Sequence, residues 1–296
     1  MFFAQRDIYK GTAIIIAAAI FYGAANISIK LSADYLNVWQ TAIGRFAMGV
    51  ILIPVLAGSF HIGLIGNQRI LLILRGIAAS FGFVFLVQAL NLISISVAMI
   101  LFYLWPAFAC LLSSSVAGER IKRIEWLFIT GAFIGTTLVF LRDGYFMEAS
   151  LGYLSALASS FFTGLAVILT RRLRRDNNPF TIYFYFCFIG VILTSIPLVT
   201  QDSPVFPASR AGWVGLLSVA AFSMTGQVLL NHGLKYLKMS KAGVLMMIEV
   251  LTSVLFGIVY LGESFTIQAL FGSCLILLSS VMLIVFPVYE EWKKAH

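Results

Sequence analysis

The sequence predicts an all-α integral membrane protein with ten transmembrane helices, arranged as two inverted repeats of five helices each. Three observations lead to this fold class. The composition is 60% hydrophobic and only 11% charged, with a mean hydropathy of +0.98, which is far from a soluble domain. Apolar stretches of membrane-spanning length follow one another along the whole chain. Segments from the first half also resemble segments from the second half.

Ten apolar stretches have the length that a bilayer requires, because a hydrocarbon core of about 30 Å takes roughly 20 helical residues. The predicted spans are 12–32, 37–57, 69–89, 95–117, 124–141, 150–170, 180–199, 212–233, 241–261 and 267–287. We interpret the first span as a retained helix, not as a cleaved leader. The longest break, 200–212, is rich in Pro and Ser and too short to fold alone. Any function must therefore reside within the helices.

The loop charges predict an orientation. If the N-terminus faces the cytoplasm, most of the 20 Lys and Arg residues fall in cytoplasmic loops, and the outer side holds only Lys30, Arg142 and Arg210. Both termini are then cytoplasmic. The net charge of +8 is thereby explained by topology, so nucleic acid is not an expected partner. Lys30 lies near the outer end of its span, where its side chain can reach water.

Two pairs of segments show the internal repeat. "ALNLISISVAMIL" at 89–101 aligns with "GLKYLKMSKAGVL" at 233–245, and "FYGAANISIK" at 21–30 aligns with "FTGLAVILTR" at 162–171. The repeats are therefore expected at 1–145 and 146–296. Because five is an odd number, the second repeat enters the membrane from the opposite side. Inverted repeats of this kind are an architecture of transporters, whose substrate sites lie near the midplane of the membrane.

The repeated elements resemble the EamA-type domains of the drug/metabolite transporter superfamily, and the likeness covers nearly the whole chain. They are Ser96, Ala98, Pro106 and Gly118-Glu119 in the first half, and Ser240, Ala242 and Gly262-Glu263 in the second. The second half departs from the pattern, because Val250 stands where a proline would match Pro106. This substitution weakens the expectation of a hinge in the ninth span. The resemblance implies an inner-membrane carrier, often an exporter of amino acids and related metabolites, with a central cavity.

Three charged residues lie deep inside predicted spans. Arg45 and Glu249 are each roughly 12 Å from the nearer surface, and Arg75 is roughly 9 Å deep. A charge at this depth is a functional candidate unless it is paired or hydrated. An arginine keeps its proton, whereas a glutamate can stay neutral until water, a substrate ammonium or an arginine reaches it. We expect Arg75 and Glu249 either to contact the polar ends of a substrate or to form a structural ion pair.

Softer candidates lie in the same spans. The residues expected to bind substrate are Tyr22, Asn26, Arg45, Arg75, Tyr103, Trp105, Gln227 and Glu249. For the two amides, hydrogen bonding between helices is an equally good explanation, and for the aromatic residues ordinary packing is the main alternative. Glu249 and His232 are candidates for proton coupling, although His232 lies close to the cytoplasmic end. Pro106 is a candidate hinge because it removes one helical hydrogen bond.

Other motifs have local explanations. The cysteines Cys110, Cys187 and Cys274 fall inside spans and are expected to pack, not to form disulfides or bind metal. The glycines of "GAFIG" at 131–135 permit close helix contact, within one chain or in a dimer. In each "GE" pair, the glycine is expected to end a helix and the acid, Glu119 or Glu263, to cap the helix that follows.

The leading hypothesis is a secondary carrier, in the form of an exporter of a small amino-acid-like or amphipathic metabolite. An uptake carrier for a metabolite or nucleotide-like cofactor is the nearer alternative. A non-transporting sensor or a lipid-modifying enzyme is the alternative from another class. No phosphate loop, HExxH, nucleophile elbow or Cys/His cluster occurs in the sequence, so we expect no enzyme, no cofactor and no metal. The expected partners are a small-molecule substrate and the lipid bilayer, with a monomer or a weak homodimer as the assembly.

Overall fold

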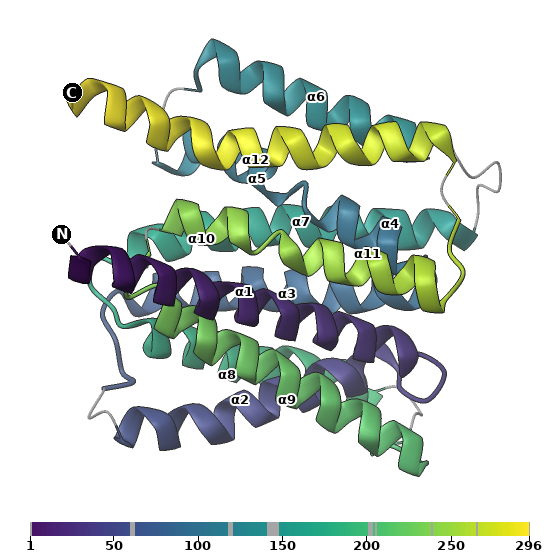
Figure 1. Ribbon diagram of the computed structural model, residues 1–296. Helices are drawn as coiled ribbons and strands as arrows, with labels where there is room; N and C mark the ends of the chain where they lie inside the picture. Colours follow the sequence, from purple (N-terminus) through teal and green to yellow (C-terminus); the bar gives the residue numbers. More distant parts are fainter. Residues whose placement is uncertain are drawn as a thin grey trace.

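The structure is a computed structural model that describes residues 2–59, 63–117, 121–140, 148–200, 204, 206–237, 239–264 and 266–295. Within these ranges every regular element is an α-helix (Figure 1). The helices are α1 (Phe2–Leu31), α2 (Val38–Ser59), α3 (Arg69–Leu92), α4 (Ile95–Phe102), α5 (Trp105–Ala117), α6 (Arg123–Phe140), α7 (Glu148–Leu173), α8 (Pro179–Thr200), α9 (Arg210–Gly233), α10 (Met239–Leu245), α11 (Ile248–Tyr260) and α12 (Ile267–Ala295).

The all-α membrane class is confirmed. Nine segments of the described chain are long and apolar enough to cross a membrane. The remaining predicted span, 124–141, corresponds to α6, which has 18 residues. Large apolar side chains also point away from the bundle, and Ile51, Val55, Val199 and Leu255 are each more than half exposed. So much outward apolar surface is rare in water, but lipid tails cover it in a bilayer.

Two of the spans are broken in the middle. The predicted span 95–117 is divided at Tyr103 and Leu104, and the span 241–261 at Met246 and Met247. Around each break, backbone hydrogen bonds join residues three apart where an α-helix would join residues four apart. The two breaks fall at corresponding positions of the two halves. The absence of a proline weakens the expectation of a hinge in the ninth span, yet this helix is interrupted between α10 and α11 without one.

Pro106 lies in the first turn of α5, directly after the break. A proline fits that position because the first turn of a helix has no partner for its N–H groups. The candidate hinge is thus the pair Tyr103-Leu104, and Pro106 fixes where α5 begins.

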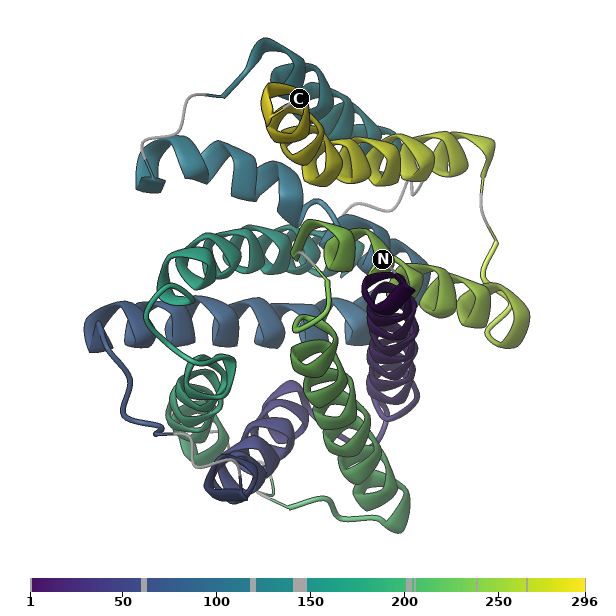
Figure 2. The ribbon, with the colours of Figure 1, turned by 60° about the vertical axis from the view of Figure 1, so that its left-hand side comes forward.

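The helices pack in pairs from distant parts of the sequence. α1 packs along α9, α3 along α7, α2 along α8 and α6 along α12. In Figure 1 and Figure 2, α6 and α12 form an upper layer, whereas α2, α8 and α9 lie at the bottom. α1, α3, α7 and the broken helices lie between these layers. The ends of α1 and α12 that carry the chain termini lie at the same end of the bundle, which we call the terminal end (Figure 1).

The "GAFIG" glycines make an intramolecular contact, as predicted for one of the two alternatives. A Cβ atom on Gly135 would lie 2.6 Å from the Gly272 carbonyl oxygen, and one on Gly272 would lie 2.6 Å from the Gly135 carbonyl oxygen. A Cβ on Gly131 would lie 2.9 Å from Ser279 Oγ. The absence of side chains on α6 therefore lets its backbone touch α12 directly.

The Lys30 side chain, which we expected to reach water, bonds to backbone carbonyls instead. Its half-buried Nζ donates to the carbonyl oxygens of Leu90, at 2.9 Å, and Ile93, at 2.7 Å. These carbonyls lie at the C-terminal end of α3, where helical oxygens have no intrahelical partner. A cation at this position is favourable because the end of a helix carries partial negative charge.

Glu263 caps a helix, but not the one that follows it. Its carboxylate accepts from the backbone N–H groups of Ile95, at 2.8 Å, and Ser96, at 3.2 Å, which begin α4 in the first half of the chain. The following helix, α12, is capped by Thr266. Gly262 has a φ of 65° directly after α11, so the prediction that glycine ends this helix is confirmed. The matching expectation for Glu119 lies outside the described residues.

We predict that Gly135→Ala destabilises the protein by about 1–3 kcal/mol, because the added Cβ forces the α6 and α12 backbones apart. Thermal unfolding of the purified protein in detergent measures this change. Gly58→Ala is the control, because nothing lies within 4 Å of a Cβ at Gly58. An equal melting temperature for Gly135→Ala and the wild type would contradict the close contact.

Candidate functional site

One cavity lies between the middle-layer helices and the bottom-layer helices α2, α8 and α9. Its volume is about 330 Å³, within the usual range for small-molecule sites. All eight residues expected to bind substrate line it: Tyr22, Asn26, Arg45, Arg75, Tyr103, Trp105, Gln227 and Glu249. The lining also includes Leu234, directly after α9, and Gly243 in α10, so it continues toward the terminal end, where these two elements are joined (Figure 1).

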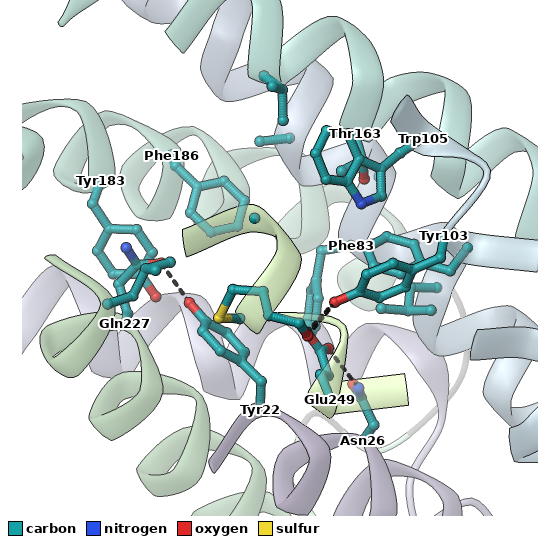
Figure 3. A pocket seen from close by; sticks show the side chains of 18 of the residues that line it. Tyr22, Asn26, Phe83, Tyr103, Trp105, Thr163, Tyr183, Phe186, Gln227 and Glu249 are labelled. Atoms are coloured by element: carbon teal, nitrogen blue, oxygen red, sulfur yellow. Dashed lines mark hydrogen bonds between the residues drawn. The ribbon is translucent and has the colours of Figure 1, made fainter. Parts of the chain in front are cut away.

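Glu249 is the acidic group of the cavity. It is 7% exposed and lies in the first turn of α11, immediately after the second helix break. Its carboxylate accepts from Asn26 Nδ2 at 2.8 Å and from Tyr103 Oη at 3.2 Å (Figure 3). A buried carboxylate is costly without such donors. Asn26 and Tyr103 come from the first half of the chain, so Glu249 connects the two halves.

Tyr103 also connects the two helix breaks. Its single hydroxyl hydrogen is shared between the Met246 carbonyl, at 2.6 Å, and Glu249 Oε2, at 3.2 Å, and its own carbonyl accepts from Ser280 Oγ at 2.7 Å. Both carbonyls lie where the regular helical hydrogen bonding is interrupted. The Ser280 hydroxyl thus satisfies the Tyr103 carbonyl, and the Tyr103 hydroxyl adds a second donor to the Met246 carbonyl, which also accepts from Glu249 N at 3.0 Å.

Arg45 is one of the two arginines that line the cavity. It is 9% exposed, and its guanidinium carbon lies 3.9 Å from the centre of the Phe83 ring and 5.7 Å from that of Phe186. Within the described residues the guanidinium has no hydrogen bond, and its Nε is fully enclosed. The ring faces stabilise the charge, and because Nε is enclosed, only the terminal Nη groups remain as donors for a ligand.

Arg75 is held by the protein. Its Nε donates to Thr170 Oγ1 at 3.0 Å and its Nη1 to the Ile182 carbonyl at 3.3 Å. Of the two alternatives for Arg75 and Glu249, the direct ion pair is not the arrangement in the described chain, because each group bonds to other partners. Both still face the same cavity.

A second polar chain crosses from α1 to α9. Tyr22 Oη donates to Gln227 Oε1 at 2.6 Å (Figure 3). Gln227 Nε2 donates to Asn231 Oδ1 at 3.1 Å. Asn231 Nδ2 is enclosed and has no protein acceptor in the described chain. Gln227 thus acts as the interhelical link that we had considered, at the edge of the cavity.

His232 is not in the cavity lining. It is exposed, and its ring lies 5.6 Å from that of Tyr236. The cavity-facing residues of α9 are Gln227, Leu230 and Leu234. These share one face of the helix, and His232 projects from another because successive residues rotate by about 100°. The candidate role of His232 in proton coupling therefore lacks structural support.

Several lining residues were missed from the sequence. Phe83, Tyr183, Phe186 and Thr163 surround the polar groups (Figure 3). The chain has 26 Phe and 11 Tyr residues, so aromatic character does not distinguish these positions. The described residues contain no group of His, Cys, Asp and Glu able to hold a metal ion.

The comparisons with known proteins agree with this architecture. The EamA-like transporter family matches the chain twice, over residues 9–141 and 150–285. The pseudopaline exporter CntI of Pseudomonas aeruginosa is 27% identical over 78% of this chain and 80% of its own. Human solute carrier family 35 member G1 is 21% identical over 93% of this chain and 79% of its own.

A solved structure supports the fold. It is titled only as the crystal structure of a protein, and it superposes with a TM-score of 0.65 at 18% identity, covering 94% of this chain and 98% of its own. The named relatives are transporters of the drug/metabolite superfamily and not enzymes. With both halves of the sequence matched, the chain belongs to the EamA-like transporter family.

Proposed function

We propose that the protein is a secondary carrier that exports a small zwitterionic metabolite bearing a carboxylate and an apolar part. The observation that carries this proposal is the free guanidinium of Arg45, which shares a cavity with the Glu249 carboxylate. Arg45 would bind the carboxylate of the cargo, and Glu249 its ammonium. Phe83 and Phe186 would contact the apolar part. The similarity to a named exporter supports export over uptake.

The proposed scaffold consists of two inverted repeats, 1–145 and 146–296. The packing pairs support it. If each span is matched with the one five later, the α1–α9 pair becomes the α7–α3 pair, and both are extensive. The pairs α2–α8 and α6–α12 each join a helix to its own counterpart. Such a pattern is what a two-fold axis in the membrane plane produces.

In the proposed location, the protein lies in the inner membrane. In the proposed orientation, its terminal end faces the cytoplasm. The basic loops support this, because positive residues favour the cytoplasmic side. The cavity lining then continues toward the cytoplasm in this conformation. The helix breaks at Tyr103-Leu104 and Met246-Met247 are suitable pivots for alternating access, since they flank the cavity in both halves. Monomers would suffice for this cycle.

We predict that Arg45→Met abolishes recognition of the cargo carboxylate. A thermal-shift screen of the purified protein measures the rise in melting temperature with each amino acid and with the amine that carries the same side chain. The wild type should respond to the zwitterion and not to the amine. Removing the cation should weaken zwitterion binding more than tenfold, as expected when about 2–5 kcal/mol of charge pairing is lost.

The exposed Arg69 supplies the control for that screen. Arg69→Met changes the net charge equally and should leave the ligand response intact. Undiminished zwitterion binding by Arg45→Met would contradict the assignment of Arg45.

We also predict that Glu249→Gln uncouples transport from protons. The amide keeps an acceptor for Tyr103 or Asn26 but cannot exchange a proton. In vesicles at constant voltage, flux through the wild type should respond to an imposed pH gradient, and flux through the variant should not. Glu125→Gln is the matched control, since Glu125 caps its own helix through Lys122 N. A variant with the pH response of the wild type would show that Glu249 is not the coupling group.

A further inference from the structure

At the end of the bundle opposite the terminal end, residues that do not line the cavity hold the helices together. The central one is Glu263, in the turn between α11 and α12. Its carboxylate oxygens accept from Ile95 N and Ser96 N, at 2.8 and 3.2 Å. Its backbone is fixed in turn, because Glu263 N donates to the Gly257 carbonyl at 3.0 Å. The first turn of α4 is thus fastened to a residue about 170 positions away in the sequence.

Lys30 binds the carbonyl side of the turn between α3 and α4. It bonds to the Leu90 and Ile93 carbonyls, whereas Glu263 bonds to the amides that follow two residues later. The turn between α3 and α4 is therefore held by a cation on its carbonyl end and an anion on its amide end. Each side-chain charge is opposite in sign to the partial charge of the helix terminus that it contacts.

Gly257 makes this arrangement possible. A Cβ at Gly257 would lie 2.6 Å from Ser96 Oγ, and it would overlap the Glu263 carboxylate. The glycine is buried in α11 and lets α4 and the Glu263 side chain approach the helix closely. We call the contacts of Glu263 with Ile95, Ser96 and Gly257 the Glu263 latch.

Two unpaired hydroxyls lie behind the latch. Ser96 on α4 and Ser253 on α11 are both fully buried, and neither Oγ has a hydrogen-bond partner within the described residues. α4 and α11 pack on one another. Buried polar groups without partners are rare and require an explanation. Hydroxyls that become hydrated when the two helices separate provide one.

We propose that the Glu263 latch is the gate at the end away from the termini, and that cargo leaves between α4 and α11 past Ser96 and Ser253. This inference rests on the proposed carrier function. In the conformation seen here the cavity lining continues toward the terminal end, as far as Leu234 and Gly243, and the latch bonds are formed. Rotation of α4 and α11 about the two breaks opens the latch, hydrates both serines and connects the cavity to the opposite side.

Thiol labelling tests the gate without any cargo. Ser253→Cys is introduced together with Cys110→Ser and Cys274→Ser, and Cys187, which is buried in α8, stays as an internal reference. The full-length protein in detergent is treated with a maleimide, and mass spectrometry gives the labelling rate at each of the two thiols. We expect slow labelling at both positions while the latch is intact.

Adding Glu263→Ala should raise the rate at the introduced thiol at least fivefold and leave Cys187 unchanged. Gly257→Ala should act in the same direction, because its methyl group displaces the carboxylate. Glu125→Ala, which removes a cap within one helix, should change neither rate.

An unchanged rate at the introduced thiol, or a parallel rise at Cys187 in both latch variants, overturns the proposal, since a parallel rise indicates general loosening. The labelling experiment and the ligand screen fail independently. A failed latch leaves the Arg45 result standing, and a failed ligand screen leaves the labelling result standing.

Discussion

The hydrogen bonding of one buried carboxylate organises the centre of this protein. Glu249 lies in an apolar span, so its cost must be offset by donors, and Asn26 and Tyr103 supply them from the other half of the chain. The same Tyr103 satisfies a carbonyl at the break that precedes Glu249. The acid, the two helix breaks and the contact between halves are therefore one interdependent unit.

Much of the fold was predictable from the sequence, because a bilayer imposes a length and a composition on each span. The spans and their approximate ends followed from apolar length alone. Pro106 indicated the break at Tyr103-Leu104, because a proline has no N–H to continue the hydrogen bonding of the preceding turn. The break at Met246-Met247 was not, because it depends on a tyrosine hydroxyl from a distant helix and no local residue marks it.

The candidate site was also predictable in part. Polar side chains inside apolar spans are conspicuous, and all eight that we selected face one cavity. Their partners were not predictable, because Arg75 bonds to Thr170 and not to Glu249. The aromatic walls and the distant contact of Glu263 were missed for the same reason: side-chain pairing between helices is decided by packing, which a single sequence does not display.

The central claim is that this cavity carries a zwitterion across the membrane by alternating access. Counterflow in vesicles tests it most directly. Vesicles containing the purified protein are preloaded with an unlabelled amino acid that stabilises it, and the uptake of the labelled compound is followed. The labelled amino acid should accumulate transiently above equilibrium, whereas the corresponding amine, which lacks the carboxylate, should not. Equal counterflow of amino acid and amine, or none with any stabilising ligand, would contradict it.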